Sequence, residues 1–128
     1  MRRIVVKQSY KDGQAILKEG SFGEGTYMIL EGKVRIIKTI QGELVEIARL
    51  EKGDYFGEMS FLDRQPRSAS AVAEGNVVLG IIDKDFLEEE ISKTSEEFRL
   101  LLYTLVERLR QTTSALVSLR AENHILKK

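Results

Sequence analysis

Short apolar runs of strand length alternate with glycine-containing turn signals over the first two thirds of the chain. The turn signals include Asp12-Gly13, Gln41-Gly42 and Lys52-Gly53, and Gly or Asn after an acidic or polar residue favours a reversal of the backbone. We expect strands at residues 2–6, 15–17, 27–30, 34–37, 44–50, 68–73 and 77–82. Many short strands at regular spacing predict a mainly β sandwich or barrel.

After Ile82 the pattern changes from strand-like to helical. Asp83 can cap a helix over residues 84–91, and Ser95 can cap a second helix that has acidic residues in its first turn. From Ser95 to Lys128 the chain contains no glycine and no proline. This stretch therefore predicts one long helix at the C-terminal end.

The long helix carries leucines at the alternating three-four spacing of a coiled coil. Heptad positions a are Leu102, Leu109, Leu116 and Asn123, and positions d are Leu105, Thr112, Leu119 and Leu126. We call these positions the seam. An asparagine at one a position is typical of a parallel dimer, so the pattern predicts a parallel homodimer through residues 102–126. The alternative is a helix that packs on its own barrel, which normally needs a wider apolar stripe.

Segment 56–71 contains the residues that best suit a ligand site. Gly57 permits a close backbone approach, and residues 58–62 form a short helical turn whose start favours an anion. Pro66 ends any helix and leaves Arg67 free to reach back, and a guanidinium can hold a phosphate through two hydrogen bonds. Glu58 suits a ligand that also carries a hydroxyl group, such as a ribose. The alternative is that Glu58 and Arg67 form an ordinary surface ion pair.

This segment resembles the phosphate-binding cassette of cyclic nucleotide-binding domains, and we call residues 56–71 the cassette. The matching residues are Phe56, Gly57, Glu58, Pro66, Arg67, Ser68 and Ala69. The resemblance extends from about Ser9 to about Leu119 and is strongest to the sensor domains of bacterial catabolite activator proteins. It implies a mainly β jelly-roll barrel (a double-stranded β-helix) with a short cassette helix and a long C-terminal dimerisation helix.

The same resemblance implies a role for each site residue. The Gly57 N–H, Arg67 and Ser68 would hold the cyclic phosphate, and Glu58 would accept a hydrogen bond from the ribose 2′-hydroxyl. The other expected ligand contacts are Phe56, Met59, Ser60 and Ala69 in the cassette, Ile36, Ile47, Ala48 and Leu50 around the base, and Thr112 and Thr113 on the long helix. The expected ligand is cyclic AMP (cAMP) or cyclic GMP (cGMP), with no separate cofactor.

Composition narrows the range of functions. The 128 residues are 42% hydrophobic, carry a net charge of zero and include no cysteine, so disulfides and zinc fingers are excluded and no nucleic-acid partner is expected. The chain shows no signal peptide and no long apolar span, so we expect a cytoplasmic protein that does not enter a membrane. His124 is the single histidine, and jelly-roll enzymes that use a metal need several, so we expect no enzyme.

These observations predict a barrel domain at residues 1–93, followed by a coiled-coil helix at residues 94–128. We expect a regulatory sensor in which nucleotide binding rearranges the dimerisation helix. Two alternatives stay open, namely a dimerisation module whose pocket has decayed and the sensor half of a longer transcription regulator.

Overall fold

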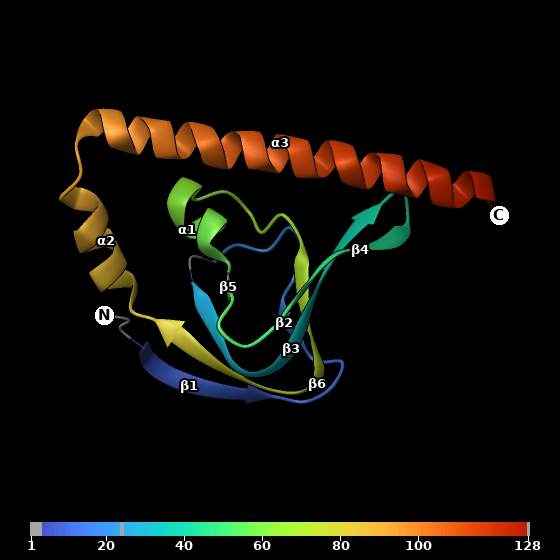
Figure 1. The fold of residues 1–128 in the computed structure, drawn as a ribbon, viewed down its shortest axis with the longest axis horizontal. Coiled ribbons are helices and arrows are strands. Elements are labelled where there is room, and N and C mark those ends of the chain that lie inside the picture. The colour runs from blue at the N-terminus through green and yellow to red at the C-terminus, as the bar shows by residue number, and fades with distance from the viewer. Residues whose placement is uncertain (1–3, 24, 128) are drawn as a thin grey trace.

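The computed structural model describes residues 4–23 and 25–127, and shows an antiparallel β barrel with a long helix across one side (Figure 1). The predicted mainly β fold class, a jelly-roll barrel with a short helix and a long C-terminal helix, is confirmed. The elements are β1 (Ile4–Tyr10), β2 (Ala15–Leu17), β3 (Tyr27–Ile40), β4 (Glu43–Leu50), β5 (Tyr55–Phe56), α1 (Glu58–Asp63), β6 (Ser70–Ile82), α2 (Lys84–Ser92) and α3 (Glu96–Lys127). Residues 2 and 3 of the predicted first strand lie outside the described residues.

Strands β3 and β6 hold the sheet together. They pair with one another, and β6 also pairs with β1 and β2 while β3 also pairs with β4 and β5. The buried core lies between these curved strands and consists of Ile29, Val34, Phe56, Ala71, Ala73, Val77 and Leu79. The core thus includes Phe56 and Ala71, the first and last residues of the cassette.

The prediction of separate strands at 27–30 and 34–37, and at 68–73 and 77–82, is wrong. Each pair is one continuous strand, because the intervening glycines form irregularities within the ladder and not chain reversals. Gly32 has a φ of 90°, and a Cβ there would lie 2.4 Å from the carbonyl oxygen of Asn76 on the facing strand. A positive φ inside a strand bends it, so these positions curve the barrel.

The turn and capping predictions between the other elements are confirmed. Gln41 and Gly42 both have positive φ, as a two-residue hairpin requires. The Asp83 side chain accepts a hydrogen bond from the Asp85 N–H at 3.0 Å, and Ser95 Oγ accepts one from the Phe98 N–H at 3.1 Å. Helices α2 and α3 therefore begin where the sequence indicates.

Helix α3 has two faces with different surroundings. Val106 and Val117 are buried, with exposed fractions of 4% and 2%, and α3 contacts α1, β3 and β4. The seam lies elsewhere on the helix: Leu105, Leu109, Leu116 and Leu119 are 46–57% exposed, Thr112 and Asn123 are exposed, Leu102 is half-buried, and the side chain of Leu126 lies outside what the structure describes. The helix thus packs on its own barrel and still leaves its seam uncovered, so the homodimer stays a prediction.

Candidate functional site

One cavity of about 240 Å³ lies beneath α3, between the barrel and the cassette. It is lined by Leu17, Ile36, Ile47, Leu50, Tyr55, Phe56, Gly57, Glu58, Met59, Ser60, Arg67, Ser68, Ala69, Ala71 and Thr113. The structure therefore brings most of the sequence-predicted site residues around a single space. Segments that are far apart in the sequence, on β3, β4, the cassette and α3, contribute to it.

Two predicted residues, Ala48 and Thr112, do not line this cavity. Ala48 is a half-buried residue of β4, and Thr112 is exposed on α3. Consecutive residues point to opposite faces of a strand and to different sides of a helix, so Ile47 and Thr113 reach the cavity while their neighbours do not. The resemblance implies that the threonine pair contacts the base from both subunits of a dimer, so the contact of Thr112 stays a prediction for the second subunit.

Leu17, Tyr55 and Ala71 line the cavity although they were not among the predicted ligand contacts. Ala71 belongs to a row of small residues at alternate positions after Arg67, and this spacing was a usable signal. Leu17 and Tyr55 lie in short strands whose sequences give no sign of the direction of each side chain. Only the curvature of the barrel brings them to the cavity.

Gly57 occupies a position that accepts no side chain. Its φ is 85°, and a Cβ there would lie 2.6 Å from the carbonyl oxygen of Gly25 and 3.0 Å from Nη1 of Arg67. Gly57 also precedes the first residue of α1. The glycine therefore lets the cassette backbone approach the neighbouring loop closely enough for its own carbonyl to reach Arg67.

Arg67 is a buried charge among neutral partners. Its side chain is 5% exposed, and it donates to the carbonyl oxygens of Gly57 at 2.9 Å and Gly25 at 3.1 Å. Burial lowers the pKa of Arg67 from its ordinary value, and the charges of Tyr27 and Glu58 oppose this effect. No carboxylate of the described residues forms an ion pair with this guanidinium. An anion in the cavity would supply a negative charge to pair with the guanidinium of Arg67.

The alternative of a surface ion pair between Glu58 and Arg67 is wrong. Arg67 is buried, whereas the side chain of Glu58 is exposed at the cavity, and the two form no ion pair. Glu58 is thus free to accept a hydrogen bond from a ligand hydroxyl. The adjoining backbone is fixed by Lys38, whose Nζ donates to the Ser68 carbonyl at 2.6 Å and to Glu19 Oε2 at 3.1 Å.

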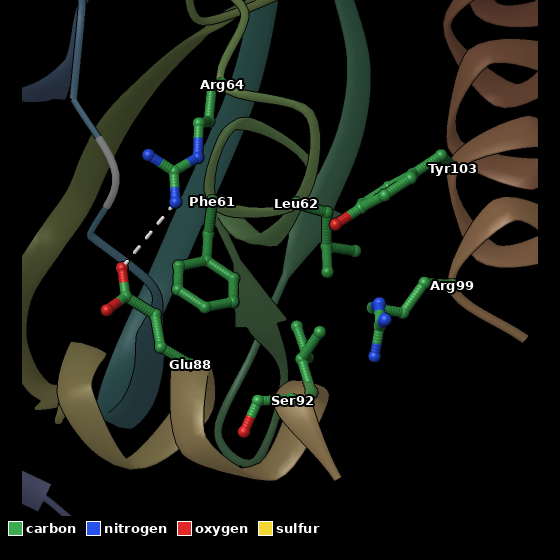
Figure 2. Close-up of a pocket in the computed structure, with 8 residues that line it drawn as sticks. Phe61, Leu62, Arg64, Glu88, Ser92, Arg99 and Tyr103 are labelled. Atoms are coloured by element: carbon green, nitrogen blue, oxygen red, sulfur yellow. Dashed lines mark ion pairs between the residues drawn. The ribbon is translucent and has the colours of Figure 1, made fainter. Parts of the chain in front are cut away.

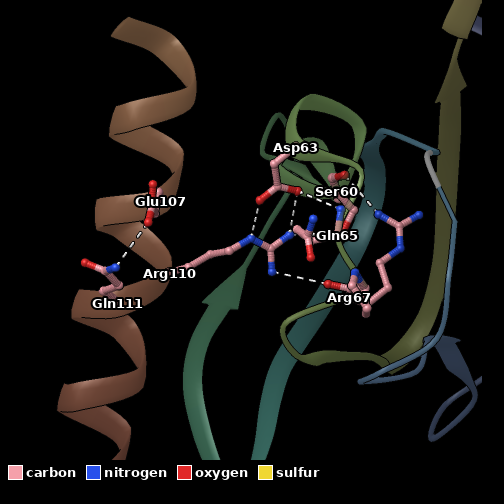
Figure 3. Close-up of polar contacts among 9 residues, drawn as sticks. Ser60, Asp63, Gln65, Arg67, Glu107, Arg110 and Gln111 are labelled. Atoms are coloured by element: carbon pink, nitrogen blue, oxygen red, sulfur yellow. Dashed lines mark hydrogen bonds and ion pairs between the residues drawn. The ribbon is translucent and has the colours of Figure 1, made fainter. Parts of the chain in front are cut away.

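Sequence reasoning missed Arg110, which reaches from α3 to the cassette. Its Nε donates to Asp63 Oδ2 at 2.5 Å, and its Nη2 donates to Asp63 Oδ1 at 3.0 Å (Figure 3). The same guanidinium donates to the Pro66 carbonyl at 3.2 Å. The available signal was the spacing of Val106, Arg110 and Val117, which places them on one face of α3, apart from the leucine seam.

A second cavity of about 370 Å³ lies between α1, α2 and α3 (Figure 2). Its lining residues are Phe61, Leu62, Arg64, Glu88, Ile91, Ser92, Arg99 and Tyr103, and Arg64 and Glu88 form an ion pair of 3.9 Å across it. None of these residues belongs to the predicted set. The cavity beside Arg67 is therefore the candidate site.

Two further observations concern the part of the chain that the structure describes. No group of three His, Cys, Asp or Glu side chains there could hold a metal ion. No helix there is long and apolar enough to cross a membrane. The chemistry available at the candidate cavity is the binding of an anion that also carries hydroxyl and apolar groups.

The family described as the cyclic nucleotide-binding domain matches residues 7–94 of this chain. A cAMP-dependent protein kinase type II regulatory subunit from Drosophila melanogaster is 42% identical over 74 residues, which are 58% of this chain and 20% of that protein. A cyclic AMP receptor protein from Thermus thermophilus is 40% identical over 83 residues, which are 63% of this chain and 38% of that protein.

Among solved structures, the EAL enzyme Bd1971 in its cAMP-bound form is similar, with a TM-score of 0.80 and 35% identity. The similarity covers 95% of this chain and 33% of that one, and the cGMP-bound form of the same enzyme gives a TM-score of 0.75. The chain thus spans a fifth to two fifths of the length of these similar proteins.

Proposed function

Because this chain belongs to the cyclic nucleotide-binding domain family, we propose that it senses cAMP and passes the binding signal to α3. The family match agrees with the prediction that was made from the cassette residues. The observation that carries the proposal is Arg67, a guanidinium with 5% exposure beside an open cavity, whose hydrogen-bond partners among the described residues are neutral carbonyls. A buried cation that forms no ion pair within the described part of the chain favours an anionic ligand.

In this proposal the phosphate of the nucleotide lies between Gly57, Arg67 and Ser68. Arg67 would exchange one or both carbonyl partners for phosphate oxygens, and a charge-assisted pair is stronger than a bond to a neutral carbonyl. Glu58 would accept a hydrogen bond from the ribose 2′-hydroxyl. The exposed position of Glu58 at the cavity supports this role.

The base would occupy the apolar part of the cavity. Ile36, Ile47 and Leu50 line that part, and Thr113 of α3 contributes a hydroxyl group. A hydroxyl both donates and accepts hydrogen bonds, so Thr113 can serve adenine or guanine. We propose cAMP as the ligand because both relatives described above carry cyclic AMP in their names, and cGMP is the alternative because other relatives are cGMP-dependent protein kinases.

We propose that nucleotide binding is transmitted to other parts of the protein by a rearrangement of the seam. Four exposed leucines on α3 would pair with those of a second copy in a parallel homodimer through residues 102–126. We divide the chain for this purpose into a sensor at residues 1–93 and a coupling helix at residues 94–128. We propose that the chain as a whole acts in the cytoplasm and catalyses no reaction itself. It would regulate a further domain or a partner.

Equilibrium dialysis against labelled cAMP tests the proposed function. Competition with cGMP and with 5′-AMP serves as the control, because 5′-AMP has the same base and ribose but an open phosphate. We expect saturable binding of cAMP, which 5′-AMP displaces poorly. Whichever of cAMP and cGMP binds with the higher affinity is assigned as the nucleotide. A folded chain that dimerises in sedimentation but retains no nucleotide would instead support the decayed-pocket alternative.

A further inference from the structure

A partly buried polar cluster joins α3 to the cassette. The side chains of Arg110 and Asp63 are 19% and 16% exposed, and Arg110 holds Asp63 through two parallel hydrogen bonds (Figure 3). The same guanidinium donates to the Pro66 carbonyl at 3.2 Å and to Ser60 Oγ at 3.4 Å. One α3 side chain therefore contacts both α1 and the segment that follows it.

These contacts span the part of the cassette that separates the two proposed phosphate-binding groups. Gly57 precedes α1, and Arg67 directly follows Pro66. Asp63 also accepts a hydrogen bond from the Gln65 N–H at 3.1 Å, so its carboxylate shapes the turn between α1 and Pro66. Any movement of α1 away from Pro66 would have to break bonds to Arg110.

Arg110 is not itself a ligand of the cavity. It is absent from the cavity lining, and its Nε, Nη1 and Nη2 all donate to protein acceptors. Its charge is also neutralised by a bidentate carboxylate. A role in fixing the cassette is therefore a better account of this residue than a role in holding phosphate.

We infer that Arg110 is a positioning residue for nucleotide binding, which fixes the distance between Gly57 and Arg67 from the side of α3. This inference rests on the proposed function. Loss of the Arg110 contacts would lower the fraction of molecules whose cassette has the geometry to bind nucleotide. The apparent affinity for nucleotide falls with that fraction. Linkage makes the coupling reciprocal, so bound nucleotide would strengthen the attachment of α3 to the cassette.

The chain offers a matched control on the same helix. Arg120 donates to the Glu46 carbonyl at 3.1 Å, which joins α3 to β4 and does not involve the cassette. Arg120→Ala removes an arginine that joins α3 to the barrel through one hydrogen bond, whereas Arg110→Ala removes an arginine that joins α3 to the cassette through four. A general weakening of the packing of α3 would affect both variants, whereas an effect through the cassette would affect only Arg110→Ala.

Calorimetric titration with cAMP distinguishes these outcomes. We expect Arg110→Ala to weaken binding about 3- to 30-fold, a typical size for coupling through a network, and Arg120→Ala to change it less than about twofold. Asp63→Asn should resemble Arg110→Ala, and the exchanged pair Asp63→Arg with Arg110→Asp should recover part of the loss. Equal affinities in Arg110→Ala and Arg120→Ala, or tighter binding in Arg110→Ala, would overturn the inference.

Hydrogen exchange of the nucleotide-free chain gives a second readout. Backbone amides of residues 60–65 and of Arg67 should exchange faster in Arg110→Ala than in Arg120→Ala or in the unchanged chain. Equal exchange would contradict the role of Arg110 in fixing the cassette. If the unchanged chain does not bind cAMP, the proposed function fails while this measurement still decides whether Arg110 holds the cassette. Should Arg110→Ala not fold, Arg110→Lys keeps the charge without the bidentate geometry and replaces it in both experiments.

Discussion

Gly57→Ala is the substitution whose effect follows most directly from the coordinates. The new Cβ would lie 2.6 Å from the Gly25 carbonyl oxygen and 3.0 Å from Nη1 of Arg67, in a residue with a φ of 85°. Two costs therefore combine. One is the left-handed backbone, and the other is an overlap with the Arg67 guanidinium and with the Gly25 carbonyl that accepts a hydrogen bond from it.

The two costs can be separated with Gly53→Ala. Gly53 has a φ of 94°, but a Cβ there would meet nothing within 4 Å, so this variant carries the backbone cost alone. A left-handed alanine costs about 1–2 kcal/mol, and the loss of unfolded-state freedom offsets about 0.4–1 kcal/mol of that. We thus expect Gly53→Ala to lower the free energy of unfolding by about 1 kcal/mol. Overlap adds about 1–3 kcal/mol, so Gly57→Ala should lower it by about 2–4 kcal/mol.

Urea unfolding followed by circular dichroism measures both variants, and cAMP titration follows on the folded proteins. Gly57→Ala should unfold at clearly lower urea than Gly53→Ala, and it should lose affinity because the overlap displaces Arg67. Gly53→Ala should bind as the unchanged chain does. Equal urea midpoints for the two variants would refute the close packing of Gly57 against Gly25 and Arg67.

Three further predictions concern α3 and the barrel surface. Leu109→Glu combined with Leu116→Glu should leave the fold intact, since both side chains are more than half exposed in the single chain, and sedimentation should show a monomer where the unchanged chain is a dimer. Val117→Ala should lower the free energy of unfolding by about 1–3 kcal/mol in urea titrations, because this side chain is 2% exposed between α3 and the barrel. The hydrogen bond from Arg35 lowers the pKa of Glu46, so its stabilising effect is present above the ordinary carboxylate range and is lost as the pH falls through the lowered pKa. Glu46→Gln should accordingly lower the unfolding temperature more at about pH 7 than at about pH 3 in thermal scans.

Local sequence signals were sufficient for most elements and for the centre of the candidate site. Capping residues such as Asp83 and Ser95, and the Gln41-Gly42 hairpin, act over a few residues, so they can be interpreted without knowledge of the fold. The cassette is equally local, because Gly57 and Arg67 lie ten positions apart and meet directly. These features were predicted for that reason.

Features that depend on contacts between distant segments could not be predicted in the same way. The sequence around Gly32 resembles a turn, and only its close approach to Asn76 on β6 shows that the strand continues. Arg110 is a polar residue outside the seam, and its partner Asp63 lies 47 positions earlier in the chain. The direction of Thr113 toward the cavity, with Thr112 exposed, depends on how α3 packs on the barrel.

The proposed function depends on the buried guanidinium of Arg67, which would bind the phosphate of a cyclic nucleotide. Calorimetric titration of the unchanged chain and of Arg67→Ala with cAMP tests it most directly, with the exposed Arg49→Ala as the matched control. Loss of one member of a buried charged pair costs about 2–5 kcal/mol, which is about 30-fold or more in affinity. We expect binding in the unchanged chain and in Arg49→Ala, and a loss of this size in Arg67→Ala. Near-equal affinity in a folded Arg67→Ala protein would contradict the proposed role of Arg67.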